Sequence, residues 1–269
     1  MSMTTKKLMN VSPADYATAA ALARAVGEQM LARLEWVALQ PSVIVDVGCG
    51  VGHFGALLQQ RYPTAKIMAT DIAYPMLQYA KQQAHQSSWI CADASVLPFR
   101  DHSVDLVFAN LVLPWCADLE KSLREWRRIL RPEGLLMFTS LGPDTLRAWR
   151  DDLANITIPD FIDMHNIGDV LTRARFADPV MDVEYFTLTY RKLTDLFHEL
   201  HASGMLNIAD DHYEQLVAMG QARCTTEGIW SVNYEVVYGH AWGPSETVEQ
   251  VADEFGTVRI PLSHLRRRA

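Results

Sequence analysis

The architecture of this chain can be worked out from one stretch, Val43-Ile44-Val45-Asp46-Val47-Gly48-Cys49-Gly50-Val51-Gly52. Its first half is apolar and β-branched, which is typical of a buried strand in a parallel sheet. Three glycines at alternate positions follow, and they let the backbone turn sharply and approach a ligand with no Cβ in the way. A helical pattern over 53–61 comes next, and its free N–H groups face that loop. This order of elements indicates a nucleotide-like cofactor site.

Further strands and helices alternate along the first half of the chain. We expect strands at 66–70, 88–91, 104–109 and 135–139, and helices at 75–84 and 118–130, the second capped by Asp118. This alternation predicts an α/β fold with a doubly wound parallel sheet. Right-handed crossovers bring the carboxyl ends of parallel strands to one edge, where ligands bind. At that edge we expect Gly48, Asp71, Asp93, Asn110 and Ser140.

The segments on either side of this core have weaker patterns. Residues 13–40 read as one helix between Pro13 and Pro41, which either covers the cofactor or packs on the sheet. We expect a turn at 132–134, helices at 143–153, 167–174 (capped by His165 or Asn166) and 193–202, and strands at 180–190 and 230–240, with 205–228 left unassigned. The chain then divides into an N-terminal helical cap (1–40), a main domain (41–242) with insertions at about 143–165 and 204–229, and a tail (243–269).

Composition and charge exclude several classes of protein. The 269 residues are 49% hydrophobic, but no apolar run approaches the ~20 residues that span a bilayer, and residues 1–11 do not resemble a secretory signal. A formal net charge of −8 argues against nucleic acid as the ligand. The four cysteines are scattered with no Cys-x-x-Cys pair, so we expect no metal site and no disulfide framework. A cytoplasmic location with no membrane contact fits best.

The spacing of the glycines discriminates among three cofactors, NAD(P), FAD and S-adenosylmethionine. The dinucleotide fingerprint is Gly-x-Gly-x-x-Gly, whereas this chain has Gly-x-Gly-x-Gly. Asp46 suits a cationic ligand, Asp71 can accept hydrogen bonds from a ribose diol, and Asp93 can accept one from an adenine amino group. Either aspartate after a strand is by itself more often a helix cap. Two of them in register after a glycine loop favour S-adenosylmethionine.

These residues resemble the motifs of class I S-adenosylmethionine-dependent methyltransferases, on Val45–Gly52, Thr70-Asp71 and Ala92-Asp93-Ala94. The resemblance implies a single-domain Rossmann-like fold. Its sheet would have seven mostly parallel strands, helices on both faces and an antiparallel last strand. The cofactor-binding residues it implies are Asp46, Gly48, Cys49, Gly50, Gly52, Asp71, Ile72, Met76, Asp93, Ala94, Asn110 and Leu111.

A narrower resemblance lies farther along the chain. Gly142-Pro143-Asp144-Thr145-Leu146 and Tyr238-Gly239-His240-Ala241-Trp242 are its most specific parts. They resemble the BioC family, the malonyl-[acyl-carrier protein] O-methyltransferases of biotin synthesis. The chain departs from that family in two places. Pro114 stands where many members have Gln. The N-terminal helix lacks the expected pattern Phe-x-x-Ala-Ala-x-x-Tyr, and Tyr16 is the nearest candidate for its tyrosine.

The chemistry that the resemblance implies needs no catalytic base. The free carboxylate of a malonyl thioester is anionic near neutral pH, so the enzyme would contribute positioning and exclusion of water. Arginine can bind a carboxylate through two hydrogen bonds, although each arginine alone is more often a surface residue. The candidate substrate-binding residues are Tyr16, Trp115, Arg147, Arg150, Arg191 and His240.

The implied partner is malonyl-acyl carrier protein, or malonyl-CoA. A carrier protein is acidic, so its docking needs a basic surface, for which the candidates are Arg124, Arg127, Arg128 and Arg131, or the arginines at 266–268. Three other interpretations remain open: a methyltransferase for a phenol or quinone, a protein resembling mitochondrial complex I assembly factors, and a non-catalytic S-adenosylmethionine-binding module.

Overall fold

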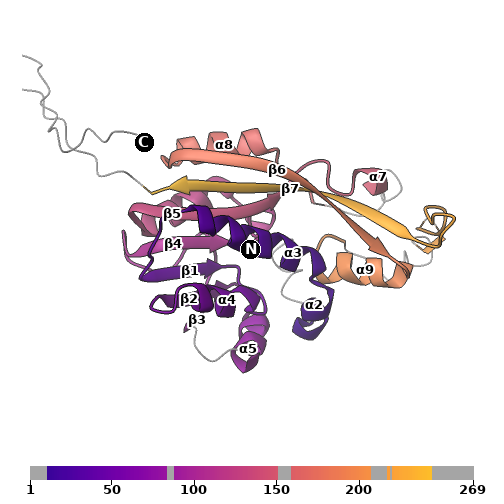
Figure 1. Ribbon diagram of the computed structural model, residues 1–269, viewed down its shortest axis with the longest axis horizontal. Coiled ribbons are helices and arrows are strands. Elements are labelled where there is room, and N and C mark those ends of the chain that lie inside the picture. The colour runs from indigo at the N-terminus through magenta and orange to yellow at the C-terminus, as the bar shows by residue number, and fades with distance from the viewer. Residues whose placement is uncertain (1–10, 84–87, 151–158, 207–216, 219, 244–269) are drawn as a thin grey trace, which may run out of the picture.

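A computed structural model describes residues 11–83, 88–150, 159–206, 217–218 and 220–243 (Figure 1). Its centre is a seven-stranded sheet with the order β3-β2-β1-β4-β5-β7-β6. The strands are β1 (Val43–Val47), β2 (Lys66–Asp71), β3 (Ser88–Cys91), β4 (Val104–Ala109), β5 (Leu130–Leu141), β6 (Ala177–Tyr190) and β7 (Trp230–Trp242).

The pairing of the strands confirms the α/β fold with a mostly parallel sheet. Neighbours among β1 to β5 pair in parallel, whereas β7 pairs antiparallel with both β5 and β6. The last strand is therefore the antiparallel one, as the resemblance implied. β5 pairs with β7 only between Val236 and Trp242, so β6 and the first residues of β7 extend beyond β5 as a two-stranded ribbon.

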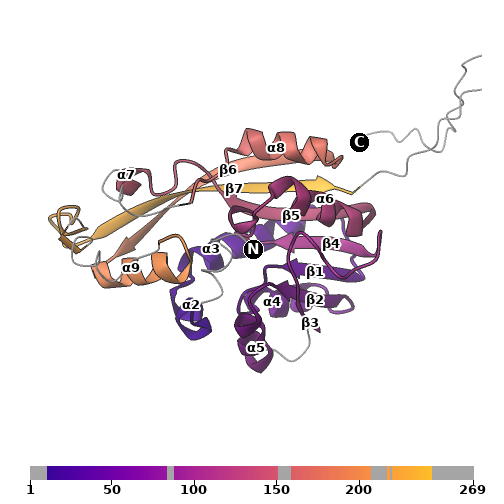
Figure 2. The ribbon, with the colours of Figure 1, turned by 180° about the vertical axis from the view of Figure 1, so that it is seen from behind.

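Helices cover both faces of the sheet because side chains alternate along each strand. Ile44 and Leu106 point to the face covered by α3 (Ala21–Arg33) and α4 (His53–Arg61) (Figure 1). Val45 and Val107 point to the opposite face, which is covered by α6 (Leu119–Ile129) and α8 (Met164–Arg173) (Figure 2). α5 (Tyr74–Gln83) packs Leu77 against Ala69 and Trp89 near the edge of the sheet. The buried faces leave the loops at the strand ends free to form a site.

The expectation of one helix over 13–40 is wrong. The segment forms α2 (Pro13–Ala19), α3 and a short 3-10 helix η1 (Leu34–Trp36), with a break at Ala20, where φ is −87° and ψ is 42°. The first turn of α3 is capped by Glu199, a residue 177 positions away. That tertiary contact leaves no trace in the periodicity of the segment.

Three other boundaries also differ from the expectation. β5 begins at Leu130, before the turn expected at 132–134. The residues of that turn form an irregularity in the pairing of β5 with β4, and Glu133 has φ of 60° there. α8 begins at Met164 with Asp163 as its cap, since the Asp163 carboxylate accepts from the His165 backbone N–H. The helix expected at 143–153 is seen as α7 (Arg147–Arg150) because a turn precedes it, and 151–153 lie outside the described residues.

The remaining elements agree with the pattern. α6 follows its cap Asp118, whose carboxylate accepts from the Lys121 N–H at 2.9 Å. α9 (Leu193–Ala202) has the expected bounds and lies beside the ribbon formed by β6 and β7. Within the unassigned stretch 205–228, residues 207–216 and 219 lie outside the described residues, as do residues 1–10 of the proposed cap and residues 244–269 of the proposed tail.

Candidate active site

A cavity of about 440 Å³ lies at the carboxyl ends of β1, β2 and β4. Its walls come from the glycine loop after β1, the loops after β2, β3 and β4, and the helices α2, α6 and α9. Topology therefore brings together segments spread over almost 190 residues. The residues chosen from the sequence that line this cavity are Tyr16, Gly48, Gly50, Asp71, Ile72, Met76, Asp93, Ala94, Asn110, Leu111 and Trp115.

The glycine loop has a backbone conformation that other residues rarely adopt. Gly48 has φ of 66° and Gly50 has φ of 52°, both in the left-handed region. A Cβ on Gly48 would overlap the side chain of Val112, and one on Gly50 would lie 3.4 Å from the ring of Tyr16. The loop is thus pressed between the segment after β4 and the N-terminal helix, and it exposes backbone to the cavity.

Asp71 joins the ends of β1 and β2. One of its carboxylate oxygens accepts from the Gly50 N–H at 2.9 Å, and the other accepts from the Ala73 N–H at 2.8 Å. Burial raises the pKa of Asp71 and these backbone hydrogen bonds partly offset that rise. Each oxygen retains a lone pair, so the side chain can also accept from hydroxyl groups in the cavity.

Asp46 lies in β1 just before the glycines and does not line the cavity. It is 2% exposed, and its Oδ2 has no hydrogen-bond partner among the described residues. Burial, followed by the nearby charge of Asp71, raises its pKa to about 8. An unpartnered buried carboxylate is costly unless a positive charge compensates it, so this residue fits a cationic ligand in the cavity.

Cys49 and Gly52 belong to the glycine loop but do not line the cavity; they contact the neighbouring strands β2 and β3. The Cys49 N–H donates to the Thr70 carbonyl at 3.0 Å, and burial raises the pKa of its thiol well above the ordinary value. Gly52 precedes α4, and a Cβ there would lie 2.6 Å from the ring of Trp89. These contacts fix the loop to the sheet.

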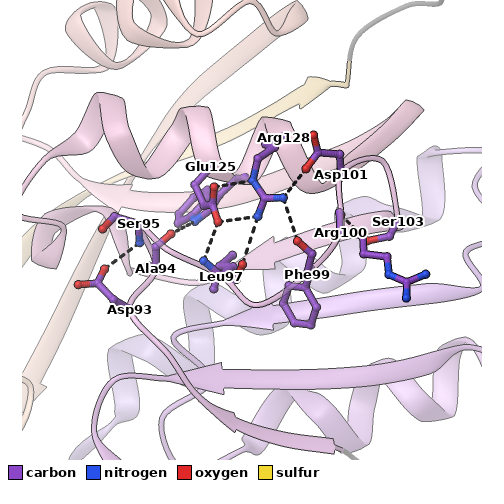
Figure 3. Close-up of polar contacts among 11 residues, drawn as sticks. Asp93, Ala94, Ser95, Leu97, Phe99, Arg100, Asp101, Ser103, Glu125 and Arg128 are labelled. Carbon is purple, nitrogen blue, oxygen red and sulfur yellow. Dashed lines mark hydrogen bonds and ion pairs between the residues drawn. The ribbon is translucent and has the colours of Figure 1, made fainter.

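The loop after β3 carries Asp93 and Ala94 and is tied to α6 (Figure 3). The Asp93 carboxylate accepts from the Ser95 N–H at 2.8 Å, and the buried Trp126 indole donates to the Ala94 carbonyl at 2.9 Å. The Glu125 carboxylate accepts from the Leu97 N–H at 2.6 Å. The loop therefore has a defined shape before any ligand binds.

Arg128 completes this attachment. Its guanidinium forms an ion pair with Glu125 at 2.7 Å and another with Asp101 at 2.6 Å, and it donates to the Phe99 carbonyl at 2.8 Å (Figure 3). The hydrogen-bonded ion pair between Arg128 and Glu125 raises the pKa of Arg128 and lowers that of Glu125. The sequence suggested Arg128 only as part of a basic surface. Nothing in the local pattern of α6 indicates that it holds the loop beside the cavity.

Asn110 links the end of β4 to the N-terminal helices. Its amide nitrogen donates to the Ala23 carbonyl at 2.8 Å, and its amide oxygen accepts from the Thr139 hydroxyl at 2.8 Å. The same hydroxyl accepts from the N–H of Leu111, whose φ is 55°. The strand edge and α3 are thereby held in register at the cavity.

The two N-terminal helices have different positions. α3 packs on the sheet, whereas α2 lies over the cavity between α5 and α9 and places Tyr16 against Gly50. Burial raises the pKa of the Tyr16 hydroxyl to about 12, with the charge of Asp71 as the next cause. The segment therefore both covers the site and packs on the sheet, which the sequence had left as alternatives.

Four of the residues chosen for the acceptor do not line the cavity. Arg147 is exposed and pairs with Asp144 at 3.0 Å, Arg150 donates to the Thr145 carbonyl at 3.2 Å, and Arg191 is exposed. His240 is half-buried in β7 opposite Met137, and burial lowers its pKa. Among the described lining residues the only lysine or arginine is Lys121.

Sequence reasoning missed one part of the cavity wall. It consists of the apolar side chains of Leu22, Leu141 and Met205 together with Glu199. The described part of the chain has no group of three His, Cys, Asp or Glu side chains that could hold a metal ion. None of its helices is both long and apolar enough to cross a membrane.

Comparisons with known proteins agree with this geometry. Residues 45–138 match the model of a methyltransferase domain. A malonyl-[acyl-carrier protein] O-methyltransferase of Methylovorus sp. (strain MP688) is 43% identical over 256 residues, covering 87% of this chain and 86% of the relative. An enzyme of the same name from Halorhodospira halophila (strain DSM 244 / SL1) is 36% identical over 280 residues, covering 98% and 95%.

Solved structures share the fold at low sequence identity. A phosphoethanolamine N-methyltransferase 2 of Haemonchus contortus, in complex with S-adenosyl-L-methionine, has a TM-score of 0.53 and 18% identity over 81% of this chain and 53% of its own. The [4+2]-cyclase SpnF has a TM-score of 0.55 and 17% identity over 81% of both chains. Since the second protein is named for a different reaction, the fold by itself does not define the chemistry.

Proposed function

The chain belongs to the malonyl-[acyl-carrier protein] O-methyltransferase family, and from that premise we propose that it transfers the methyl group of S-adenosylmethionine to the free carboxylate of a malonyl thioester. The observation that carries the cofactor assignment is the pair formed by Asp71 and the glycine loop, because Asp71 faces the cavity while holding Gly50 in place. When bound, S-adenosylmethionine supplies an electrophilic methyl group on a sulfonium.

Each part of the cofactor has a candidate partner in the described residues. We assign the ribose hydroxyls to the Asp71 carboxylate, the adenine to Asp93 and Ala94, and the amino-acid end to the backbone at Gly48 and Gly50. Asp46, buried beneath the loop with one oxygen unpartnered, would compensate the positive charge of the ligand. Ile72, Met76 and Leu111 would contact its apolar surfaces.

The acceptor needs orientation more than activation. A malonyl carboxylate is already ionised at neutral pH, so the described residues need only place one oxygen in line with the methyl group and keep water out. Tyr16 and the apolar wall of Leu22, Leu141 and Met205 suit this task. Arg147, Arg150 and Arg191 lie outside the cavity, so any contact they make would be farther along the thioester arm.

For the carrier protein we propose a docking surface along α6. Lys121 lines the cavity, and Arg124 and Arg127 follow it on the same helix. Arg124 pairs with Glu120, Arg128 with Glu125 and Asp101, and Arg131 with Asp105, so much of the positive charge of the cluster is balanced. The arginines at 266–268 lie outside the described residues.

Charge reversal tests this surface. The double variant Arg124→Glu with Arg127→Glu should raise KM for malonyl-acyl carrier protein and leave KM for malonyl-pantetheine unchanged, because this short thioester has neither the acidic surface of the carrier nor the phosphates of CoA. An equal rise in KM for both substrates would exclude this docking surface. The comparison also shows which of the two thioesters the unmodified protein prefers.

A transfer assay tests the function itself. Purified protein is incubated with labelled S-adenosylmethionine and malonyl-acyl carrier protein, with acetyl-acyl carrier protein as the control that lacks a free carboxylate. We expect label in a base-labile methyl ester with the malonyl substrate alone. We also expect the chain to restore growth without biotin in a strain that lacks its own malonyl methyltransferase. Cofactor binding without transfer to any malonyl thioester would refute the proposal.

The main alternative acceptor is a phenol or quinone. Such a substrate must lose a proton during transfer, so its rate would require a base that titrates near neutral pH. A carboxylate acceptor predicts no such requirement between about pH 6 and 8. The pH profile of kcat with the active acceptor therefore separates the two reactions.

A further inference from the structure

Glu199 of α9 is a buried carboxylate that lines the cavity although no motif marks it. Its side chain is held from two directions: Oε1 accepts from the Leu22 N–H at 3.2 Å, and Oε2 accepts from the Tyr190 hydroxyl at 2.9 Å. The residue is 6% exposed. It thus connects α3, β6 and α9 at one point of the cavity wall.

The hydrogen bond to Leu22 satisfies an end of α3 that has no cap of its own. Ala20 stands at the N-cap position, and alanine has no side-chain acceptor for the free N–H groups of a first turn. Glu199 supplies that acceptor from a distant part of the chain. Its negative charge also lies at the end of a helix where negative charge is favourable.

Because the chain breaks at Ala20, the contact between Leu22 and Glu199 also affects the position of α2, the helix that covers the site. α2 is joined to α3 through Ala20, and the Arg24 guanidinium donates to the Ala17 carbonyl at 2.8 Å across the break. α2 also packs on α9 and carries Tyr16 to the glycine loop. The position of Tyr16 over Gly50 therefore depends on how the first turn of α3 is held to α9.

The groups around Glu199 favour a fixed arrangement. Burial raises the pKa of its carboxyl, while the Leu22 N–H, the Tyr190 hydroxyl, the charge of Arg24 and the Ala21 N–H lower it, in that order. A buried carboxylate without partners would be costly, so the side chain is confined to the position where these donors meet. On the carboxyl side of Glu199, Ala202, Ser203 and Met205 continue the wall of the cavity.

We propose that Glu199 is a positioning residue that fixes α2 and the first turn of α3 to α9, so that Tyr16 is held over the glycine loop where the methyl donor would bind. Glu199 would then connect α2, which covers the glycine loop, with α9, which continues the wall of the cavity. The cofactor-affinity part of this inference rests on the proposed function, whereas the position of α2 does not.

The test compares two substitutions at Glu199. Glu199→Ala removes both hydrogen bonds, and we expect about a tenfold weaker affinity for S-adenosylhomocysteine, which corresponds to a loss of about 1.4 kcal/mol. Amide hydrogen exchange over residues 12–24 should rise in the same variant. Glu199→Gln should stay within about threefold of the unmodified protein, because the amide oxygen can accept from Leu22 and the Tyr190 hydroxyl can rotate to accept from the amide.

Glu235→Ala is the matched control, since Glu235 is also a buried carboxylate that accepts from a backbone N–H but does not line the cavity. It should lower stability without changing affinity for S-adenosylhomocysteine or exchange over 12–24. If Glu199→Ala changes neither quantity, or if both alanine variants change them equally, the positioning role is wrong. If the unmodified protein does not bind S-adenosylhomocysteine, the cofactor assignment fails, and exchange over 12–24 still decides the role of Glu199.

Discussion

The Glu235 carboxylate of β7 accepts a hydrogen bond from the Asp144 N–H at 2.7 Å, and this contact fastens the turn after β5 to the neighbouring strand. The Thr145 hydroxyl adds to it by donating to the Glu235 carbonyl and accepting from the Glu235 N–H, both at 3.1 Å. The two stretches that resemble one family most specifically, residues 142–146 and the strand around 238–242, are thus joined through Glu235. Their co-occurrence in sequence has a structural basis.

Removal of the Glu235 carboxylate should destabilise the protein. Glu235→Ala leaves the partly buried Asp144 N–H without this acceptor, which costs about 1–3 kcal/mol. Glu235→Gln keeps an acceptor oxygen and should retain most of that stability. Urea unfolding followed by circular dichroism measures both. A free energy of unfolding for Glu235→Ala equal to that of the unmodified protein would contradict this role.

Gly142 should be intolerant of a side chain for the same reason. A Cβ on Gly142 would overlap the Glu235 carboxylate, so Gly142→Ala must displace a hydrogen-bonded group. We expect a loss of about 1–3 kcal/mol in the unmodified background and a much smaller loss when Glu235→Ala is already present. Unfolding of the two single variants and the double variant gives this coupling energy. Strictly additive losses would show that Glu235 is not the obstacle.

The alternating half of the fold could be predicted because its information is local. Apolar strands, breaking residues and the Asp118 cap fix β1 to β4, α4 and α6 almost to the residue. The carboxyl-edge residues followed from strand order, since parallel strands place Gly48, Asp71 and Asn110 at one edge. This placement depends only on the direction and order of the strands.

What could not be predicted depends on contacts between distant residues. The break at Ala20 is stabilised by Glu199, the boundary of α7 by Glu235, and the shape of the loop after β3 by Arg128. Each of these charged residues reads in sequence as a solvated position on a helix or strand. The arginines chosen for the acceptor illustrate the converse, because their chemistry suits a carboxylate but their positions leave them outside the cavity.

Arg128 should affect the cofactor although it does not line the cavity. Arg128→Ala removes the ion pairs to Glu125 and Asp101 and the hydrogen bond to Phe99, so the loop that carries Asp93 should lose its fixed shape. We expect KM for S-adenosylmethionine to rise about five- to tenfold, equivalent to about 1–1.4 kcal/mol, with kcat reduced less. Steady-state kinetics at saturating acceptor measures this split.

Arg173→Ala is the control for Arg128, because Arg173 forms an exposed ion pair with Glu120 at 3.2 Å on the same side of the sheet. Exposed pairs contribute about 0–1 kcal/mol, so its KM for the cofactor should stay unchanged. Equal rises in KM in the two variants would indicate a general loss of positive charge and would exclude a specific effect on the loop.

Asp71 should be sensitive even to an isosteric change. Asp71→Asn replaces one acceptor oxygen by an N–H₂ group, which must then face the N–H of Gly50, the N–H of Ala73 or a ribose hydroxyl. We expect affinity for S-adenosylhomocysteine to fall at least about tenfold, which corresponds to a loss of about 1.4 kcal/mol or more in binding free energy. Calorimetric titration measures it, with the exposed Asp182→Asn as control. Unaltered affinity for Asp71→Asn would contradict the ribose assignment.

Asp46 should make the stability of the ligand-free protein depend on pH. Its pKa in the folded protein is about 8, above the ordinary value of 3.8, so between these values the folded state holds a proton that the unfolded chain releases. The contribution of Asp46 to the free energy of unfolding is therefore fully present below about pH 4, declines as pH rises, and is lost once the pH passes the folded pKa.

Asp46→Asn removes this ionisation while keeping the shape of the side chain. Relative to that variant, the unmodified protein should become less stable between pH 5 and pH 8, by at most about 1.4 kcal/mol per pH unit, and the difference should level off above that range. Urea unfolding of both proteins at several pH values measures it. Because the sulfonium of S-adenosylmethionine favours the ionised carboxylate, its affinity should rise with pH in the unmodified protein and not in Asp46→Asn. A pH-independent difference in both quantities would place the titrating group elsewhere.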